Sequence, residues 1–250
     1  MPLTPAVSSG RSAGLLLLAA LLLFQSGCRP VREAAPVTPA EPGATPPVSL
    51  EVPAGYNRYR VASAESDVRV LAYRDGPMAR LGHNHVVSSR SLQGDIFVDD
   101  KGQEPRVSLV LPVASLVVDN AERRSEEGED FQDVVDDAAM SETRENMLSD
   151  PLLDAARFPA IRLTSQKVEG RGPEYTMTVS IEVKGQTHEL RVPVRVEQGP
   201  KELQASGAFT VTHKDLGLTP FTVMGGLLSV RDQIKVRFRI VARPPTTDGS

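Results

Sequence analysis

Alternation of apolar and polar residues dominates the second half of the chain. Every second residue is apolar at 177–184 (MTVSIEVK), and the same alternation returns at 189–196 and 234–240. A period of two residues predicts β-strands with one buried face. Lys184-Gly185-Gln186 separates the first two runs and predicts a hairpin turn.

Less regular apolar runs predict further strands at 59–62, 68–73, 92–98 and 107–118, with Pro112 marking an edge or a bulge in the last. About eight strands, most with one apolar face and short polar connections, predict an all-β fold with an antiparallel sheet. The sheet could close into a barrel or fold into a sandwich. We favour the barrel, because eight strands enclose just enough volume for packed side chains or one small ligand.

One acidic segment interrupts the strand pattern. Residues 119–137 hold nine acids and two arginines, and the apolar positions within 131–138 follow helical spacing. We therefore predict a short helical insertion, with further short helices at 141–148 and 151–157. We interpret the acidic run as a solvated face; a calcium site is the alternative, although the ordered spacing of an EF-hand loop is absent.

The N-terminal region differs from the rest of the chain. Residues 1–27 hold one charge, Arg11, and an apolar run of about ten residues, whereas a membrane-spanning helix needs roughly 20. This combination predicts a signal peptide and an exported protein. Ser26-Gly27 directly before Cys28 resembles the lipobox of bacterial lipoproteins, so we expect Cys28 to be acylated. Secretion with a free thiol is the alternative.

Seven prolines between Arg29 and Gly55 predict a semi-extended linker, because proline fixes φ and lacks an N–H. The expected organisation is a lipoprotein signal peptide (1–27), a lipidated cysteine with a Pro-rich linker (28–55), a β-barrel domain (56–243) and a disordered tail (244–250). The expected location is the bacterial periplasm, on a membrane. Arg29 in place of an Asp after the cysteine favours the outer membrane.

Composition narrows the classes of function. A net charge of −4 gives no basic footprint for nucleic acid, so no nucleic-acid partner is expected. A single cysteine excludes intramolecular disulfides and Cys-rich zinc sites. Aromatic residues make up 4% and tryptophan is absent, which predicts an aliphatic core. Neither a nucleophile elbow nor a glycine-rich phosphate loop is present, so we expect no enzyme and no cofactor.

The four histidines are the main candidates for chemistry. In an extended segment, the sequence GHNH at 82–85 places His83 and His85 on the same side. Strand parity also places His188 and His213 on inward faces. Three interpretations remain open: satisfied interior histidines, a polar patch that orients the head group of a ligand in an apolar cavity, and a metal site that uses His83 and His85 with one of the other two.

Several motifs together resemble the YceI-like family. The most specific is DPLLDAARFPAI at 150–161; GHNH at 82–85 and the hairpin VKGQTHELRVP at 183–193 agree with it, and the resemblance covers about residues 56–243. It implies a lipocalin-like eight-stranded antiparallel barrel, exported to the periplasm, that binds a long polyisoprenoid chain such as a quinone tail. An aliphatic interior is compatible with such a chain.

We therefore expect a lipid-anchored binding protein, without enzymatic activity, that holds a polyisoprenoid, quinone-like or similar amphiphilic lipid in its barrel. The alternatives are the metal-binding protein and a surface interaction module with a solid barrel, in which the acidic segment recognises a partner. The expected polar contacts are His83, His85, His188 and His213. The expected inward wall consists of Val179, Ile181, Val183, Leu190, Val192, Val194, Phe209, Val211, Val236 and Phe238.

Overall fold

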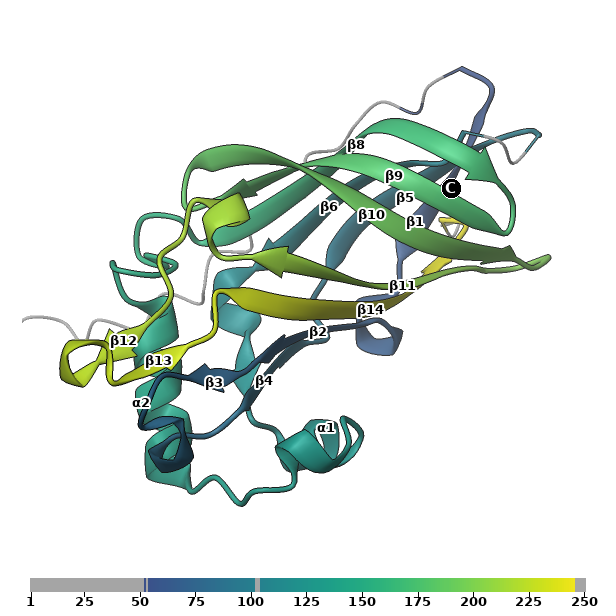
Figure 1. The fold of residues 1–250 in the computed structure, drawn as a ribbon. Coiled ribbons are helices and arrows are strands. Elements are labelled where there is room, and N and C mark those ends of the chain that lie inside the picture. Colours follow the sequence, from purple (N-terminus) through teal and green to yellow (C-terminus); the bar gives the residue numbers. More distant parts are fainter. Residues whose placement is uncertain (1–51, 53, 102–103, 246–250) are drawn as a thin grey trace, which may run out of the picture. The chain divides into compact units, whose positions relative to one another are not determined.

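The strands of the computed structural model, which describes residues 52, 54–101 and 104–245, form an antiparallel sheet that closes on itself (Figure 1). The ring consists of β1 (Tyr56–Val61), β5 (Gln93–Asp99), β6 (Arg106–Pro112), β8 (Ala160–Arg171), β9 (Glu174–Val183), β10 (Gln186–Gln198), β11 (Leu203–Thr212) and β14 (Gln233–Arg243). These eight strands pair in that order, and β1 closes the ring because it pairs with both β5 and β14. The predicted lipocalin-like barrel is confirmed.

Three more strands extend the wall: β2 (Asp67–Ala72), β4 (His85–Ser89) and β7 (Val117–Val118). β2 pairs with β14, β4 with β2, and β7 with β4. β1 and β2 share one edge of β14, separated by the 3-10 turn η1 (Ser63–Glu65). The predicted strand at 107–118 is likewise broken after Pro112, by the 3-10 turn η3 (Val113–Ser115).

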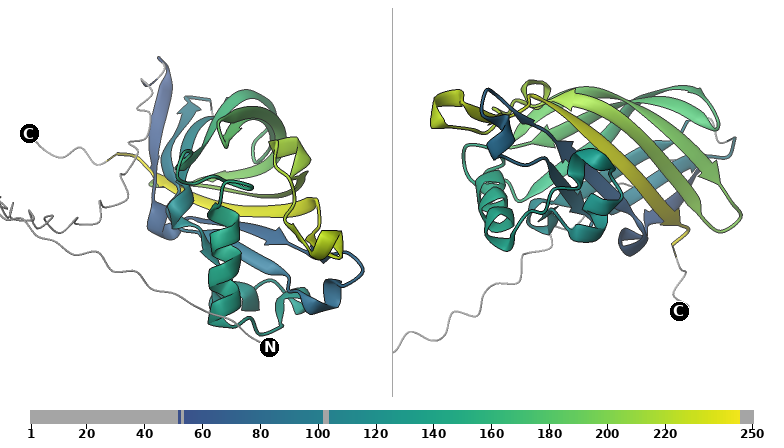
Figure 2. Two further views of the ribbon diagram at one scale, coloured as in Figure 1. Left: turned by 90° about the vertical axis from the view of Figure 1, so that its left-hand side faces the viewer. Right: turned by 60° about the horizontal axis from the view of Figure 1, so that its bottom comes forward.

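Helix α2 (Asp137–Leu148) and a small second sheet lie at one end of the barrel, opposite the β10–β11 turn (Figures 1 and 2). The small sheet consists of β12 (Thr222–Val223), β13 (Leu228–Val230) and β3 (Arg74–Asp75). The remaining helical pieces are α1 (Ala121–Ser125), η2 (Ala79–Leu81), η4 (Glu129–Phe131), η5 (Lys214–Leu216) and η6 (Met224–Gly226). Within the described ranges, every helix is too short or too polar to span a bilayer.

The β9–β10 hairpin shows how sequence parity builds the wall. Lys184 and Gly185 form its turn with φ of 49° and 71°, the positive values that fit a tight hairpin to the twist of the sheet. Gly185 is also required by space, because a Cβ there would lie 2.5 Å from the Phe158 ring. In the resulting register Leu190 lies opposite Val179, so the apolar residues of both strands share the inner face.

The predicted helix at 151–157 is wrong. Residues 151–157 form successive turns, because the amides of Leu153 and Asp154 donate to the carbonyls of Met147 and Ser149 and so end α2. Asp154 then takes a φ of 47°, which a helix does not contain. The predicted helix at 141–148 is confirmed as the C-terminal part of α2.

The short helical insertion predicted for 119–137 is present as α1, but the spacing within 131–138 does not correspond to one helical face. Phe131 ends the short η4 and is buried, whereas Val134 is 90% exposed. Asp136 then starts α2, because its carboxylate accepts the N–H of Ala139 and caps the first turn. The matching spacing was therefore a coincidence of composition, and the burial of Phe131 comes from tertiary packing with Leu71 and Val86.

Candidate ligand cavity and its histidine end

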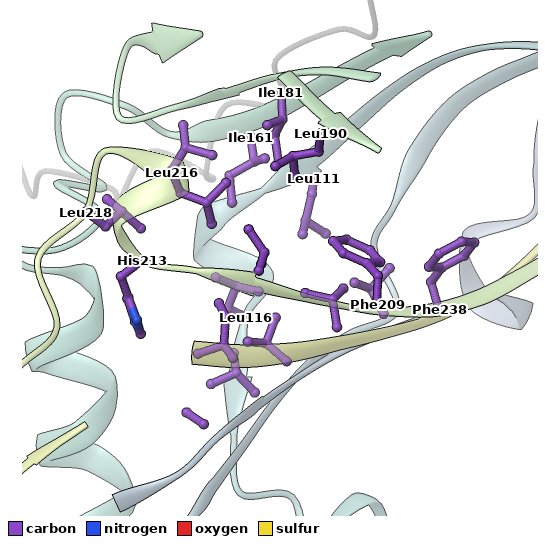
Figure 3. Close-up of a pocket in the computed structure, with 18 of the residues that line it drawn as sticks. Leu111, Leu116, Ile161, Ile181, Leu190, Phe209, His213, Leu216, Leu218 and Phe238 are labelled. Atoms are coloured by element: carbon purple, nitrogen blue, oxygen red, sulfur yellow. The ribbon is translucent and has the colours of Figure 1, made fainter. Parts of the chain in front are cut away.

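A cavity of about 400 Å³ lies inside the barrel, within the range of roughly 300–1,000 Å³ that is usual for ligand pockets. Leu190, Val192, Val194 and Val196 of β10 all line it, which gives a length of about 20 Å at roughly 3.3 Å per residue. Figure 3 shows Phe209 and Phe238 directed into the interior from neighbouring strands. The cavity is therefore long relative to its volume.

All ten residues of the predicted inward wall line this cavity. They do so because β9, β10, β11 and β14 keep an unbroken alternation of inward and outward side chains. Their contact with a ligand stays a prediction. Because the cavity is present, the alternative of a solid barrel is wrong.

Sequence reasoning missed the part of the wall that comes from other elements. These residues include Leu109, Leu111, Ile161, Leu163, Met147 and Phe221, from β6, β8, α2 and the segment before β12. Alternation at 161–163 was the available signal for β8, but a bulge between Ser165 and Lys167 shortens the pattern. Met147 gave no signal, because a helix residue reaches the cavity only through tertiary packing.

The polar residues of the lining gather at one end. They are Arg74, His83, His85, Thr143, Asn146, His213 and Ser229, and they come from the elements around α2 and the small sheet. Toward the β10–β11 turn, the described lining residues are apolar, among them Val196, Leu203 and Ala205. Phe221 lines the histidine end and is 37% exposed, so the cavity reaches the surface there.

His85 is held by a buried carboxylate on its outer side. Its Nδ1 lies 2.6 Å from Asp119 Oδ2, and Asp119 Oδ1 accepts the Val86 amide at 2.8 Å and Arg124 Nη1 at 2.6 Å. Burial raises the pKa of the Asp119 carboxyl, but the hydrogen bonds from His85, Val86 and Arg124 outweigh burial and hold the pKa below its usual value. Asp119 is therefore an ionised acceptor.

The acidic segment (119–137) supports the GHNH motif at 82–85 from outside the barrel. Arg124 is buried and also donates to the carbonyl oxygens of Asn84 (2.6 Å) and Asp133 (3.0 Å). The Asn84 side chain donates in turn to the carbonyl oxygen of Asp130 at 2.8 Å. Asn84 thus points into the segment, while its two neighbours His83 and His85 line the cavity.

The other histidines differ in their surroundings. His213 is 7% exposed, and its Nδ1 lies 2.8 Å from the backbone oxygen of Asp232. His83 Nδ1 is buried without a hydrogen-bond partner. His188 has inward parity but does not line the cavity, because it packs against Gly217, where a Cβ would lie 2.9 Å from the His188 ring. Three of the four expected polar contacts, His83, His85 and His213, therefore line the cavity.

The YceI-like domain profile matches residues 59–242 of this chain. The chain belongs to the YceI-like family. This extent coincides with the barrel, from β1 to β14. No curated protein matches the sequence.

Solved structures share the YceI-like fold at low sequence identity. BcnA of Burkholderia cenocepacia is 16% identical, with 72% of this chain and 98% of BcnA covered and a TM-score of 0.53. A polyisoprenoid binding domain from Saccharophagus degradans, implicated in plant cell wall breakdown, is 12% identical (75% and 98% covered, TM-score 0.49). The YceI protein of Campylobacter jejuni is 14% identical (64% and 84% covered, TM-score 0.46). Likeness at such identities concerns the fold alone.

The described residues of this YceI-like barrel do not assemble the histidine metal site that was one of the alternatives. The rings of His83 and His85 have centroids 6.5 Å apart. Within the part of the chain that the structure describes, no three His, Cys, Asp or Glu side chains are placed to hold one ion, whereas zinc takes three or four protein ligands. The arrangement of the lining instead suits an amphiphile, with one polar end and a long apolar part.

Proposed function

We propose that this protein binds one long apolar lipid of the polyisoprenoid class, quinone-like lipids included, inside the barrel, with the lipid's polar group at the histidine end. The observation that carries this proposal is the elongated cavity whose polar residues all lie at one end. Apolar burial drives such binding at about 25 cal/mol per Å², less the ordering entropy of the chain. The resemblance to YceI-like proteins implies the same class of ligand.

Binding, and not catalysis, is the role we assign to the histidine end. YceI-like proteins are binding proteins rather than enzymes. His85 and Asp119 form a hydrogen-bonded pair, and in a binding site this pair orients a polar group for the ligand.

We further propose that the barrel is exported and attached to the periplasmic side of a membrane through acylated Cys28. Support comes from the apolar run, the small residues before Cys28 and the Pro-rich stretch after it. These residues lie outside the part of the chain that the structure describes.

The lipid proposal is tested by organic extraction and mass spectrometry of the protein purified from bacterial membranes. We expect about one polyisoprenoid lipid per chain in the wild type and loss of most of it in Val179→Trp, because the indole would fill the cavity beside Leu190. Thr178→Trp is the matched control, since the neighbouring residue on β9 does not line the cavity and should retain the lipid.

Circular dichroism would establish that both variants fold. Absence of stoichiometric lipid from the wild type, or full retention of the lipid by folded Val179→Trp, would count against the proposal.

A further inference from the structure

We propose that, within the class of lipids proposed above, the cavity prefers those whose polar group donates a hydrogen bond, such as a hydroxyl, over those whose polar group only accepts, as a quinone does, or carries negative charge. His85 and His213 would accept that hydrogen bond. This inference rests on the proposed function, because it specifies the chemistry of the polar group on the lipid that the barrel holds.

The tautomer of His85 follows from its partner. Asp119 is ionised and buried, and an ionised carboxylate only accepts hydrogen bonds. The 2.6 Å contact between His85 Nδ1 and Asp119 Oδ2 therefore requires the proton on Nδ1. In the neutral ring, Nε2 then carries a lone pair, and the ring lines the cavity.

His213 reaches the same tautomer through a different acceptor. Its Nδ1 lies 2.8 Å from the backbone oxygen of Asp232, which can only accept. The proton is again fixed on Nδ1, and the neutral ring offers Nε2 as an acceptor. Figure 3 shows the His213 ring at the end of the cavity away from Phe209 and Phe238. Two rings, one on β4 and one in the turn between β11 and η5, are thus set in the same protonation pattern.

The fold holds the backbone of Asp119 in an unfavourable conformation. Asp119 has a φ of 53°, a left-handed conformation that costs a non-glycine residue free energy. Its amide donates to the Val86 oxygen at 2.8 Å while its carboxylate accepts the Val86 amide at 2.8 Å. These two hydrogen bonds fix the carboxylate beneath His85.

Both arginines near this end already donate to oxygen acceptors of the protein. Arg74 lines the cavity, but its Nη1 donates to the Gly82 carbonyl oxygen at 2.6 Å and pairs with Asp133 Oδ2 at 3.3 Å. Arg124 is occupied by Asp119 and by two carbonyl oxygens. A phosphate would therefore meet the lone pairs of the two rings near the negative charge of Asp119, and we expect it to bind more weakly than an alcohol.

The decisive binding experiment compares three ligands that share one apolar chain: geranylgeraniol, its methyl ether and geranylgeranyl phosphate. Delipidated wild-type protein should bind the alcohol about fivefold more tightly than the ether, as expected for one net hydrogen bond, and more tightly than the phosphate. In His85→Phe and His213→Phe the preference for the alcohol should fall toward onefold. His188→Phe is the matched control and should keep the preference, because His188 does not line the cavity.

The outcomes separate this inference from the proposed function. Equal affinity for alcohol and ether, or tightest binding of the phosphate, would overturn the inference while leaving lipid binding intact. If none of the three ligands binds, the proposed function fails and the inference with it.

A second measurement tests the premise without any ligand. Nitrogen-15 NMR of the imidazole rings at neutral pH distinguishes a protonated Nδ1 from a protonated Nε2. We expect Nδ1–H for both His85 and His213, with assignment by the His85→Phe and His213→Phe variants. A proton on Nε2 of either neutral ring would overturn the inference at that residue.

Discussion

Asp119 connects the histidine end of the cavity to the acidic segment outside the barrel. Its side chain is fully buried and contacts both His85 and Arg124. Removal of one partner of a buried ion pair leaves the other charge uncompensated, which typically costs about 3–5 kcal/mol. The residue therefore contributes to stability as well as to the orientation of His85.

We expect Asp119→Asn to lower the free energy of unfolding at pH 7 by about 3 kcal/mol, measured by urea denaturation. The pKa of Asp119 in the folded protein lies below its usual value of 3.8, so the ionised form stabilises the fold. This stabilisation is present above about pH 4 and is lost as the pH falls through the lowered pKa. The difference between wild type and variant should therefore shrink in strong acid.

Asp130→Asn is the matched control, since the Asp130 side chain is exposed and only its backbone oxygen holds Asn84. Its effect should stay within about 0.5 kcal/mol at either pH. An Asp119→Asn difference that is independent of pH would contradict the role of the ionised carboxylate.

The positions of the histidines were predictable from the sequence only in part. Parity placed His83 and His85 at the cavity because a strand has a local period of two residues. The partner of His85 was not predictable, because Asp119 is 34 residues away along the chain and lies in a segment interpreted as a solvated face. His188 was placed wrongly at the cavity, because parity does not show the loop at Gly217 that packs against it.

The acidic segment packs against the barrel wall, although its composition indicated a solvated face. Phe131 is 1% exposed and packs with Leu71 and Val86, and its ring lies 5.4 Å from that of Tyr73. These contacts join the segment to the outer face of β2 and β4. The same strands carry the cavity wall on their inner face, through Val70 and Val87.

Phe131→Ala should lower the free energy of unfolding by about 3–5 kcal/mol, because it opens a cavity beneath the segment. Val134→Ala, three residues away, should change it by less than about 0.5 kcal/mol, because Val134 is 90% exposed. Thermal and urea denaturation of the two variants would check the contrast. Similar losses in both would favour the helical face that the spacing had predicted.

Gly94 in β5 is a second position where an element depends on one residue. Its φ is 127°, and a Cβ would lie 2.1 Å from the backbone oxygen of Ser108 on β6. Gly94→Ala should therefore destabilise the protein by about 3 kcal/mol in urea denaturation. Gly199→Ala in the β10–β11 turn is the control, because its nearest contact would be 3.5 Å. A neutral Gly94→Ala would contradict the tight β5–β6 approach.

The whole molecule combines a barrel closed at β1 with a cavity that is polar at one end only. That the sheet closes into a barrel was predictable from the sequence. Eight strands that each have one apolar face have few other ways to cover the open edges of their sheet. The strand order and the extension by β2, β4 and β7 were not predictable, because they depend on pairings between distant segments. The apolar wall followed from alternation, whereas the gathering of polar residues at one end followed only from the three-dimensional arrangement.

The proposed anchor and the proposed cavity are independent features of the chain, so one variant can separate them. Acyl chains contribute about 0.8 kcal/mol of membrane binding per buried CH₂, and Cys28 is the single cysteine that could carry them. We expect Cys28→Ala to lose metabolic labelling with radioactive palmitate and to move to the soluble fraction, while the purified barrel still yields its lipid on extraction. Membrane retention of the unlabelled variant would contradict the anchor, and loss of the cavity lipid would mean that loading depends on attachment.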